Sequence, residues 1–124
     1  MKPPTCGHPA IDIPVTQGSP IRATADGIVS VVHDQRFVRD TSGKILRSAL
    51  NYIAIIHDSG VSSRYLHLIK IYVRPDQFVK QGDIIGLSGG LPGTAGSGGI
   101  TTGAHLHFEI RVNGLPDDPL KFLP

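Results

Sequence analysis

Apolar and polar positions alternate over short stretches of this chain, and no long window has the 3.6-residue spacing of an amphipathic helix. Short apolar runs rich in Val, Ile and aromatic residues are typical of β-strands. Such runs predict strands at residues 28–32, 52–57, 61–68, 77–80, 84–87 and 104–112. The pattern therefore predicts an all-β fold, a small antiparallel β-sheet or sandwich.

Turn signals lie between these runs. Asp26-Gly27 precedes the first run, and Asn113-Gly114 follows the last one. Asp58-Ser59-Gly60 separates two runs that we expect to pair as a hairpin. Gly82-Asp83 separates residues 77–80 from 84–87 and predicts a second strand pair.

The remaining segments are predicted as extended chain and loops. Prolines recur in residues 1–18, which excludes a long helix there. Residues 34–50 are polar and predict an exposed excursion. Residues 86–103 carry eight glycines and no charge, which predicts a flexible surface loop. The tail at 119–123 is expected to form one helical turn over an end of the sheet.

Composition narrows the class of protein. A chain of 124 residues suits a single domain, residues 1–124, and without Trp its core must consist of Val, Ile and Leu. A formal net charge of +2 with no dense cationic cluster does not indicate nucleic-acid binding. No apolar stretch is long enough for a membrane span or a signal peptide. Cys6 is the only cysteine, so an internal disulfide is excluded.

Two histidines on the last predicted strand are the first candidates for chemistry. His105 and His107 are two positions apart, so both rings should lie on one face of that strand. Leu106, Phe108 and Ile110 would then face the core. Glu109 lies on the histidine face, either as a hydrogen-bond partner of a metal-binding histidine or as a surface carboxylate.

A second candidate pair lies near the N-terminus. His8 and Asp12 are four apart in an extended stretch, and positions four apart on a strand also share a face. A His, an Asp and one further His form a donor set that suits Zn²⁺ and leaves a fourth position for water. Chance spacing remains the alternative. His33 and His57 are predicted as ordinary exposed strand-end residues. Cys6, two positions before His8, could reach a metal, but the expected role is that of a free thiol.

Taken together, these motifs resemble those of the LytM/lysostaphin-type peptidases, metallopeptidase family M23. Residues 8–12 resemble the family's HxGxD motif, with Ala10 in place of the usual Gly, and residues 103–109 resemble its GxHLHFE motif. The other matching segments, in chain order, are residues 18–29, 51–57, 65–68 and 79–86. The resemblance thus extends over residues 8–112 and is specific.

The resemblance implies a role for each matched residue. His8, Asp12 and His107 match the zinc ligands, while His67 and His105 match two histidines that do not bind the metal. Zinc would lower the pKa of a water molecule to about 7. One histidine would take its proton and later protonate the leaving amine, and the other would stabilise the oxyanion.

The implied substrate is bacterial peptidoglycan, cut in its stem peptide or cross-bridge. The loops at 34–50 and 88–103 would form walls of the groove. Such an enzyme acts outside the cytoplasm, in the periplasm, on the cell surface, as a secreted protein or within a phage particle. The sequence specifies neither the bond that is cut nor the oligomeric state.

Two other function classes compete. One is a catalytically inactive family member that serves as a binding or regulatory domain, but such members usually lack ligands. The other is a biotinyl or phosphoryl carrier domain. A biotinyl carrier needs a Lys at a hairpin tip, usually beside Met, and Met1 is the only methionine here.

Overall fold

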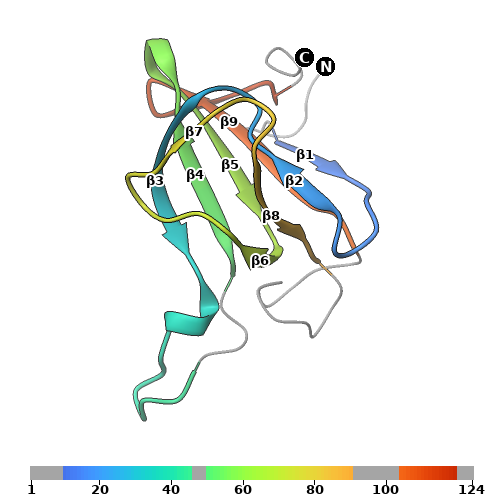
Figure 1. Cartoon of the computed structure of the whole chain (residues 1–124), viewed down its shortest axis with the longest axis vertical. Coiled ribbons are helices and arrows are strands. Elements are labelled where there is room, and N and C mark those ends of the chain that lie inside the picture. Colours follow the sequence, from blue (N-terminus) through green and yellow to red (C-terminus); the bar gives the residue numbers. More distant parts are fainter. Residues whose placement is uncertain (1–9, 46–49, 91–103, 120–124) are drawn as a thin grey trace.

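The computed structural model describes residues 10–45, 50–90 and 104–119. The strands found in this part of the chain are β1 Ala10–Ile13, β2 Pro20–Arg22, β3 Gly27–His33, β4 Tyr52–Ile56, β5 Val61–Leu66, β6 Leu68–Ile71, β7 Phe78–Val79, β8 Ile84–Ser88, β9 Leu106–Val112 and β10 Leu115–Asp117. Two single-turn 3₁₀ helices, η1 Gln35–Phe37 and η2 Asp58–Gly60, complete the elements. The all-β prediction is confirmed (Figure 1).

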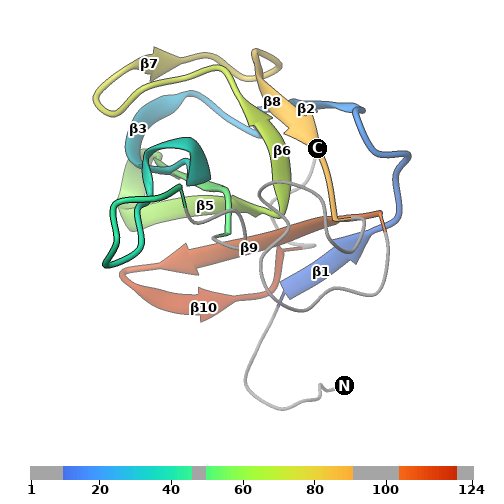
Figure 2. The same ribbon diagram turned by 90° about the horizontal axis from the view of Figure 1, so that it is seen from below.

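The strands form two antiparallel sheets. The larger sheet has the order β1-β9-β5-β4-β3-β7, with β10 paired to β9, and the smaller one has the order β2-β8-β6. Figure 2 shows β6 and β8 running across the direction of β5 and β9. The two sheets therefore form a small sandwich, as the sequence pattern predicted.

The core lies between the two sheets. Ile53 and Ile55 of β4 are fully buried, as are Leu68 of β6 and Ile85 of β8. On β9, Leu106, Phe108 and Ile110 are buried while the residues between them are half-buried, which confirms the predicted register. Because of this alternation, the half-buried side chains of β9 lie on the opposite face of the larger sheet from the core residues.

Asp26-Gly27 starts β3, as predicted, and the glycine is needed for a close approach between strands. A Cβ at Gly27 would overlap the carbonyl oxygen of Ile56 and would lie 2.7 Å from Cγ2 of Ile55. Any side chain there would have to displace the backbone of β4. The turn signal thus marks a packing constraint as well as a change of direction.

Two predicted strand assignments were wrong. The run at 61–68 is not one strand, because the chain turns at His67, whose φ of 65° lies in the left-handed region. The runs at 77–80 and 84–87 do not pair with each other: β7 pairs with β3, and β8 pairs with β2 and β6. The Gly82-Asp83 turn carries the chain from one sheet to the other, and local turn chemistry does not encode that change.

The loops are described in part. Residues Arg39 and Ile45 form an isolated antiparallel bridge, which agrees with the predicted hairpin-like excursion, while 46–49 lie outside the described residues. The predicted glycine-rich loop falls mostly on residues 91–103, and the predicted helical turn mostly on 120–124, both outside the described residues. No helix in the described ranges is long and apolar enough to cross a membrane.

Candidate active site

The candidate site lies where the end of β1, the end of β5 and the start of β9 meet. In the register of the larger sheet, Asp12 of β1 lies opposite His107 of β9, which lies opposite Leu66 of β5. His67 follows Leu66 directly, and His105 precedes β9, bridged to Gly89 at the end of β8. Four residues from three parts of the sequence are thus brought to one end of the sheet.

His107 is held between two carboxylates. Its Nδ1 lies 2.9 Å from Oδ1 of Asp12, and its Nε2 lies 2.9 Å from Oε2 of Glu109. When Nε2–H donates to Glu109, the lone pair of Nδ1 is directed toward Asp12. This is the arrangement in which a carboxylate orients a histidine and leaves its other nitrogen for a metal ion. Glu109 is therefore a hydrogen-bond partner of His107 rather than an isolated surface carboxylate.

The pKa values of His107 and Glu109 shift in opposite directions. The hydrogen bond to Glu109 raises the pKa of His107, burial opposes that effect, and the hydrogen bond to Asp12 adds to it. The hydrogen bond to His107 lowers the pKa of Glu109, against the opposing effect of burial. Glu109 thus remains an anion that favours the orientation of the His107 ring.

The His67 ring lies close to the rings of both His105 and His107. The ring centroids of His67 and His105 are 5.0 Å apart, and those of His67 and His107 are 5.9 Å apart. Nε2 of His105 is 3.9 Å from Oδ1 of Asp12. Both histidines of the HLH stretch thus approach the same carboxylate oxygen, which confirms that they share a face.

Asn51 lies beside the histidine cluster and was assigned no role from the sequence. It is 2% exposed, and its side chain accepts a hydrogen bond from the Gln35 amide at 2.6 Å and donates one to the Leu68 carbonyl at 2.9 Å. Its own carbonyl accepts from the His67 amide at 3.0 Å. Because His67 has a positive φ that is uncommon for residues other than glycine, these bonds hold a strained backbone in place.

We expect Asn51→Ala to lower both stability and turnover. Removing the amide leaves the Gln35 N–H and the Leu68 carbonyl without partners, at about 1–3 kcal/mol each. A displacement of His67 by about 1 Å would reduce kcat about 100-fold. Thermal unfolding, zinc content and steady-state cleavage measure these effects.

Gln77→Ala is the matched control for Asn51→Ala, because Gln77 has an exposed amide that accepts one hydrogen bond from the Arg74 amide. Gln77→Ala should change neither stability nor turnover appreciably. Loss of zinc from Asn51→Ala, or a fall in stability with kcat unchanged, would contradict a role in positioning His67.

The donor set suits a zinc ion. A carboxylate oxygen and an imidazole nitrogen face each other 2.9 Å apart, and both are common zinc donors. In residues 10–45, 50–90 and 104–119, no three His, Cys, Asp or Glu side chains form a complete metal-binding group. His8, the third ligand expected from the resemblance, lies outside the described residues, as does Cys6.

The prediction that His33 and His57 are exposed was wrong, because both are half-buried and hydrogen-bonded. Nδ1 of His33 binds the Leu50 carbonyl, and its ring stacks on Tyr52. His57 binds the Asp26 carbonyl through Nδ1 and the Ser63 hydroxyl through Nε2. Both histidines therefore have hydrogen-bond partners of their own, and neither belongs to the cluster around Asp12.

Comparison with protein families gives a match over most of the chain. The model of peptidase family M23 matches residues 6–119. This range includes all five residues that the sequence singled out: His8, Asp12, His67, His105 and His107.

Individual relatives agree with the family match. The chain is 39% identical over 114 residues to peptidoglycan DD-endopeptidase ShyB of Vibrio cholerae, covering 92% of this chain and 22% of the relative. A zinc-containing peptidase from Vibrio cholerae superposes with a TM-score of 0.72 at 38% identity, over 94% of this chain and 31% of that one. The catalytic domain of lysostaphin from Staphylococcus simulans superposes with a TM-score of 0.69 at 28% identity, over 93% and 77%. The chain thus spans about a fifth of the length of the curated relatives it matches.

Proposed function

The chain belongs to peptidase family M23, and on that premise we propose that it is a zinc-dependent endopeptidase that hydrolyses peptide bonds of bacterial peptidoglycan. The observation that carries the proposal is the convergence of Asp12, His107, His67 and His105 at one end of the larger sheet. The printed names of the relatives support the substrate class, because ShyB is named a peptidoglycan endopeptidase. Such a substrate lies outside the cytoplasm, where the domain would act.

Zinc would be held by Asp12 and His107, with His8 as the third ligand. A bound zinc ion supplies Lewis-acid chemistry, since it acidifies a water molecule and polarises a carbonyl group. Glu109 keeps the His107 ring oriented through its hydrogen bond to Nε2. The half-buried position of His107 and Glu109 limits competition from bulk water for these interactions.

His67 and His105 supply the proton transfers in this proposal. One imidazole accepts a proton from the attacking water and returns it to the amine that leaves when the peptide bond breaks. The other donates a hydrogen bond to the carbonyl oxygen as negative charge develops on it. Their ring centroids are 5.0 Å apart, and both residues are half-buried rather than fully buried.

The first test is the zinc content of the purified protein together with digestion of purified cell walls. We expect about one zinc ion per chain, and loss of digestion on chelation with recovery when zinc is restored. Full zinc content without cleavage of any wall type would favour the inactive binding or regulatory domain. Absence of zinc from a folded protein would refute the metallopeptidase proposal.

A further inference from the structure

Asp12 and His107 belong to a row of side chains across the outer face of the larger sheet, the face opposite the core. In this row Leu66 of β5 lies opposite His107 of β9, which lies opposite Asp12 of β1. The next row along the same face contains Arg64 of β5 and Glu109 of β9, which lie opposite each other. Because every second residue of a strand lies on the same face, Arg64 shares the outer face with His107.

Arg64 is a diagonal neighbour of His107 in this register. It lies two positions before Leu66, the residue opposite His107. Diagonal neighbours on one face of a sheet are about 7–8 Å apart, a distance that a long side chain can span. The guanidinium of Arg64 can therefore contact a substrate that lies across His107.

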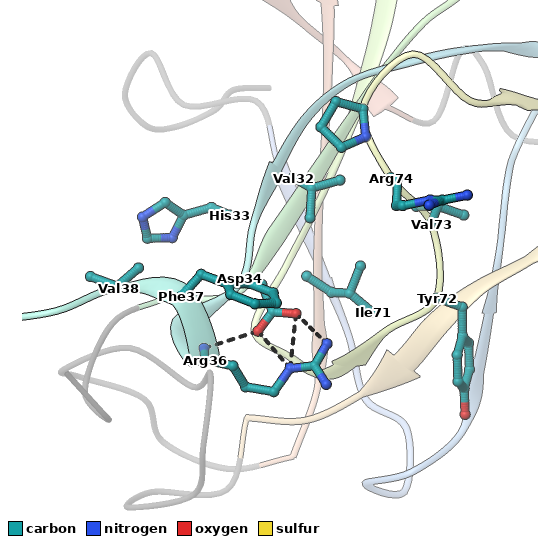
Figure 3. A pocket seen from close by; sticks show the side chains of 11 residues that line it. Val32, His33, Asp34, Arg36, Phe37, Val38, Ile71, Tyr72, Val73 and Arg74 are labelled. Carbon is teal, nitrogen blue, oxygen red and sulfur yellow. Dashed lines mark hydrogen bonds and ion pairs between the residues drawn. The ribbon is translucent and has the colours of Figure 1, made fainter. Parts of the chain in front are cut away.

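Aromatic rings orient the Arg64 side chain on the outer face. Its Cζ lies 5.9 Å from the centroid of the Tyr52 ring, which in turn stacks on His33 with centroids 5.4 Å apart. Figure 3 shows the His33 ring on the opposite side of β3 from Val32, a residue that packs against the core and lines a pocket of about 790 Å³ beside η1. A cation–π contact holds the guanidinium without an oxygen acceptor, so its N–H donors stay available.

The charge of Arg64 has no anionic partner in the part of the chain that the structure describes. Arg64 is half-buried, and within residues 10–45, 50–90 and 104–119 its guanidinium forms neither a hydrogen bond nor an ion pair. Arg111, on the other side of Glu109, is also half-buried, but its Nη2 lies 3.7 Å from Oε1 of Glu109. A partly desolvated guanidinium gains free energy when a carboxylate accepts its hydrogen bonds, above all when two form in parallel.

We propose that Arg64 binds a free carboxylate of the peptide substrate, about two residues away from the bond that is cut. The inference rests on the proposed function, which puts a peptide bond at His107. An extended peptide covers about 3.3–3.6 Å per residue, so about two residues span the distance between the two diagonal neighbours. The carboxylate is either the C-terminus of the peptide or the side group of an acidic residue. Arg64 thus selects substrates that carry a negative charge at this position over substrates that carry an amide.

The kinetic test uses one cross-linked wall peptide in three forms: with all carboxylates free, with the C-terminus amidated, and with the acidic side group amidated. In the wild type, we expect amidation of the recognised carboxylate to lower kcat/KM about 10- to 100-fold, because a charge-assisted hydrogen-bonded pair is lost. The form that shows this loss identifies the source of the carboxylate. In Arg64→Met, kcat/KM on the free form should fall by the same factor, amidation should have no further effect, and zinc content should be unchanged.

Arg111→Met is the matched control, because Arg111 is also half-buried on the outer face and also adjoins Glu109. It lies about 13 Å along β9 from His107, so this variant should keep the preference for the free carboxylate. Arg64→Lys keeps the charge and should retain part of the preference. A wild type without any preference, an equal loss on all three forms in Arg64→Met, or a preference that also disappears in Arg111→Met would overturn the proposal.

Binding is measured directly by NMR of the arginine Nε–H groups in the zinc-loaded protein. The signal that is missing from Arg64→Met belongs to Arg64. We expect it to shift when the peptide with free carboxylates is added, and not when the peptide amidated at both positions is added. A signal that shifts with both peptides or with neither would contradict carboxylate binding. If the wild type cuts none of the three forms, the proposed function fails, and this titration alone decides whether Arg64 binds a carboxylate.

Discussion

Replacing His107 by alanine is expected to remove both bound zinc and wall cleavage. His107 faces Asp12 through Nδ1 and Glu109 through Nε2, so the substitution removes a metal donor and leaves two carboxylates facing an empty space. Lewis-acid stabilisation of a transition state contributes several kcal/mol, and about 4 kcal/mol corresponds to about a 1,000-fold loss of rate. We therefore expect kcat/KM to fall at least about 1,000-fold and zinc content to fall toward zero.

The measurements are zinc content by mass spectrometry of metals and release of soluble wall fragments, with circular dichroism to confirm folding. His57→Ala is the matched control, because it also removes a half-buried, hydrogen-bonded imidazole. His57 follows the last residue of β4, whereas Asn51, which contacts His67, precedes the first. The control should keep its zinc and its activity at a temperature where it is folded. Full zinc in folded His107→Ala would remove this residue from the ligand set.

The second large effect is expected from His67→Ala and, separately, from His105→Ala. Loss of a positioned acid–base or oxyanion-stabilising group lowers the rate about 100- to 10,000-fold. Because neither residue is assigned to the zinc ligands, both variants should retain about one zinc ion per chain. The diagnostic result is thus a loss of kcat with metal content unchanged, the reverse of the pattern expected for a ligand.

His105 requires the closer check, since its Nε2 is 3.9 Å from the same Asp12 oxygen that faces His107. Zinc titration of the two variants, at matched protein concentration, measures the metal affinity of each. Zinc affinity that falls in His105→Ala as far as in His107→Ala would assign His105 to the metal instead. A variant that keeps wild-type kcat would remove its histidine from the reaction.

The strand pattern was predictable where one face of a strand is buried. On β9, Leu106, Phe108 and Ile110 alternate with His107 and Glu109, and a one-residue shift would bury the polar set. The shared face of His105 and His107 follows from the same alternation. A period of two is a local property, so it can be recognised without knowing which strands are neighbours.

The break at His67 was not predictable from the pattern. Residues 61–68 read as a continuous strand, yet the chain leaves the larger sheet after Leu66 and joins the smaller one at Leu68. The hydrogen bonds that stabilise the left-handed conformation of His67 come from Asn51, which is sixteen positions earlier. A local reading of the sequence has no access to a contact over that separation.

The sequence by itself determined the all-β class, the core face of the last strand and the set of candidate residues, because periodicity and residue chemistry are local. Tertiary structure alone decided that Asp12 lies opposite His107, that Glu109 orients the ring, and that Asn51 supports His67. It also decided the pairing of β7 with β3 and the pocket beside η1. These features depend on which segments are neighbours in space, and that is settled by burial of the whole core between two sheets rather than by any one segment.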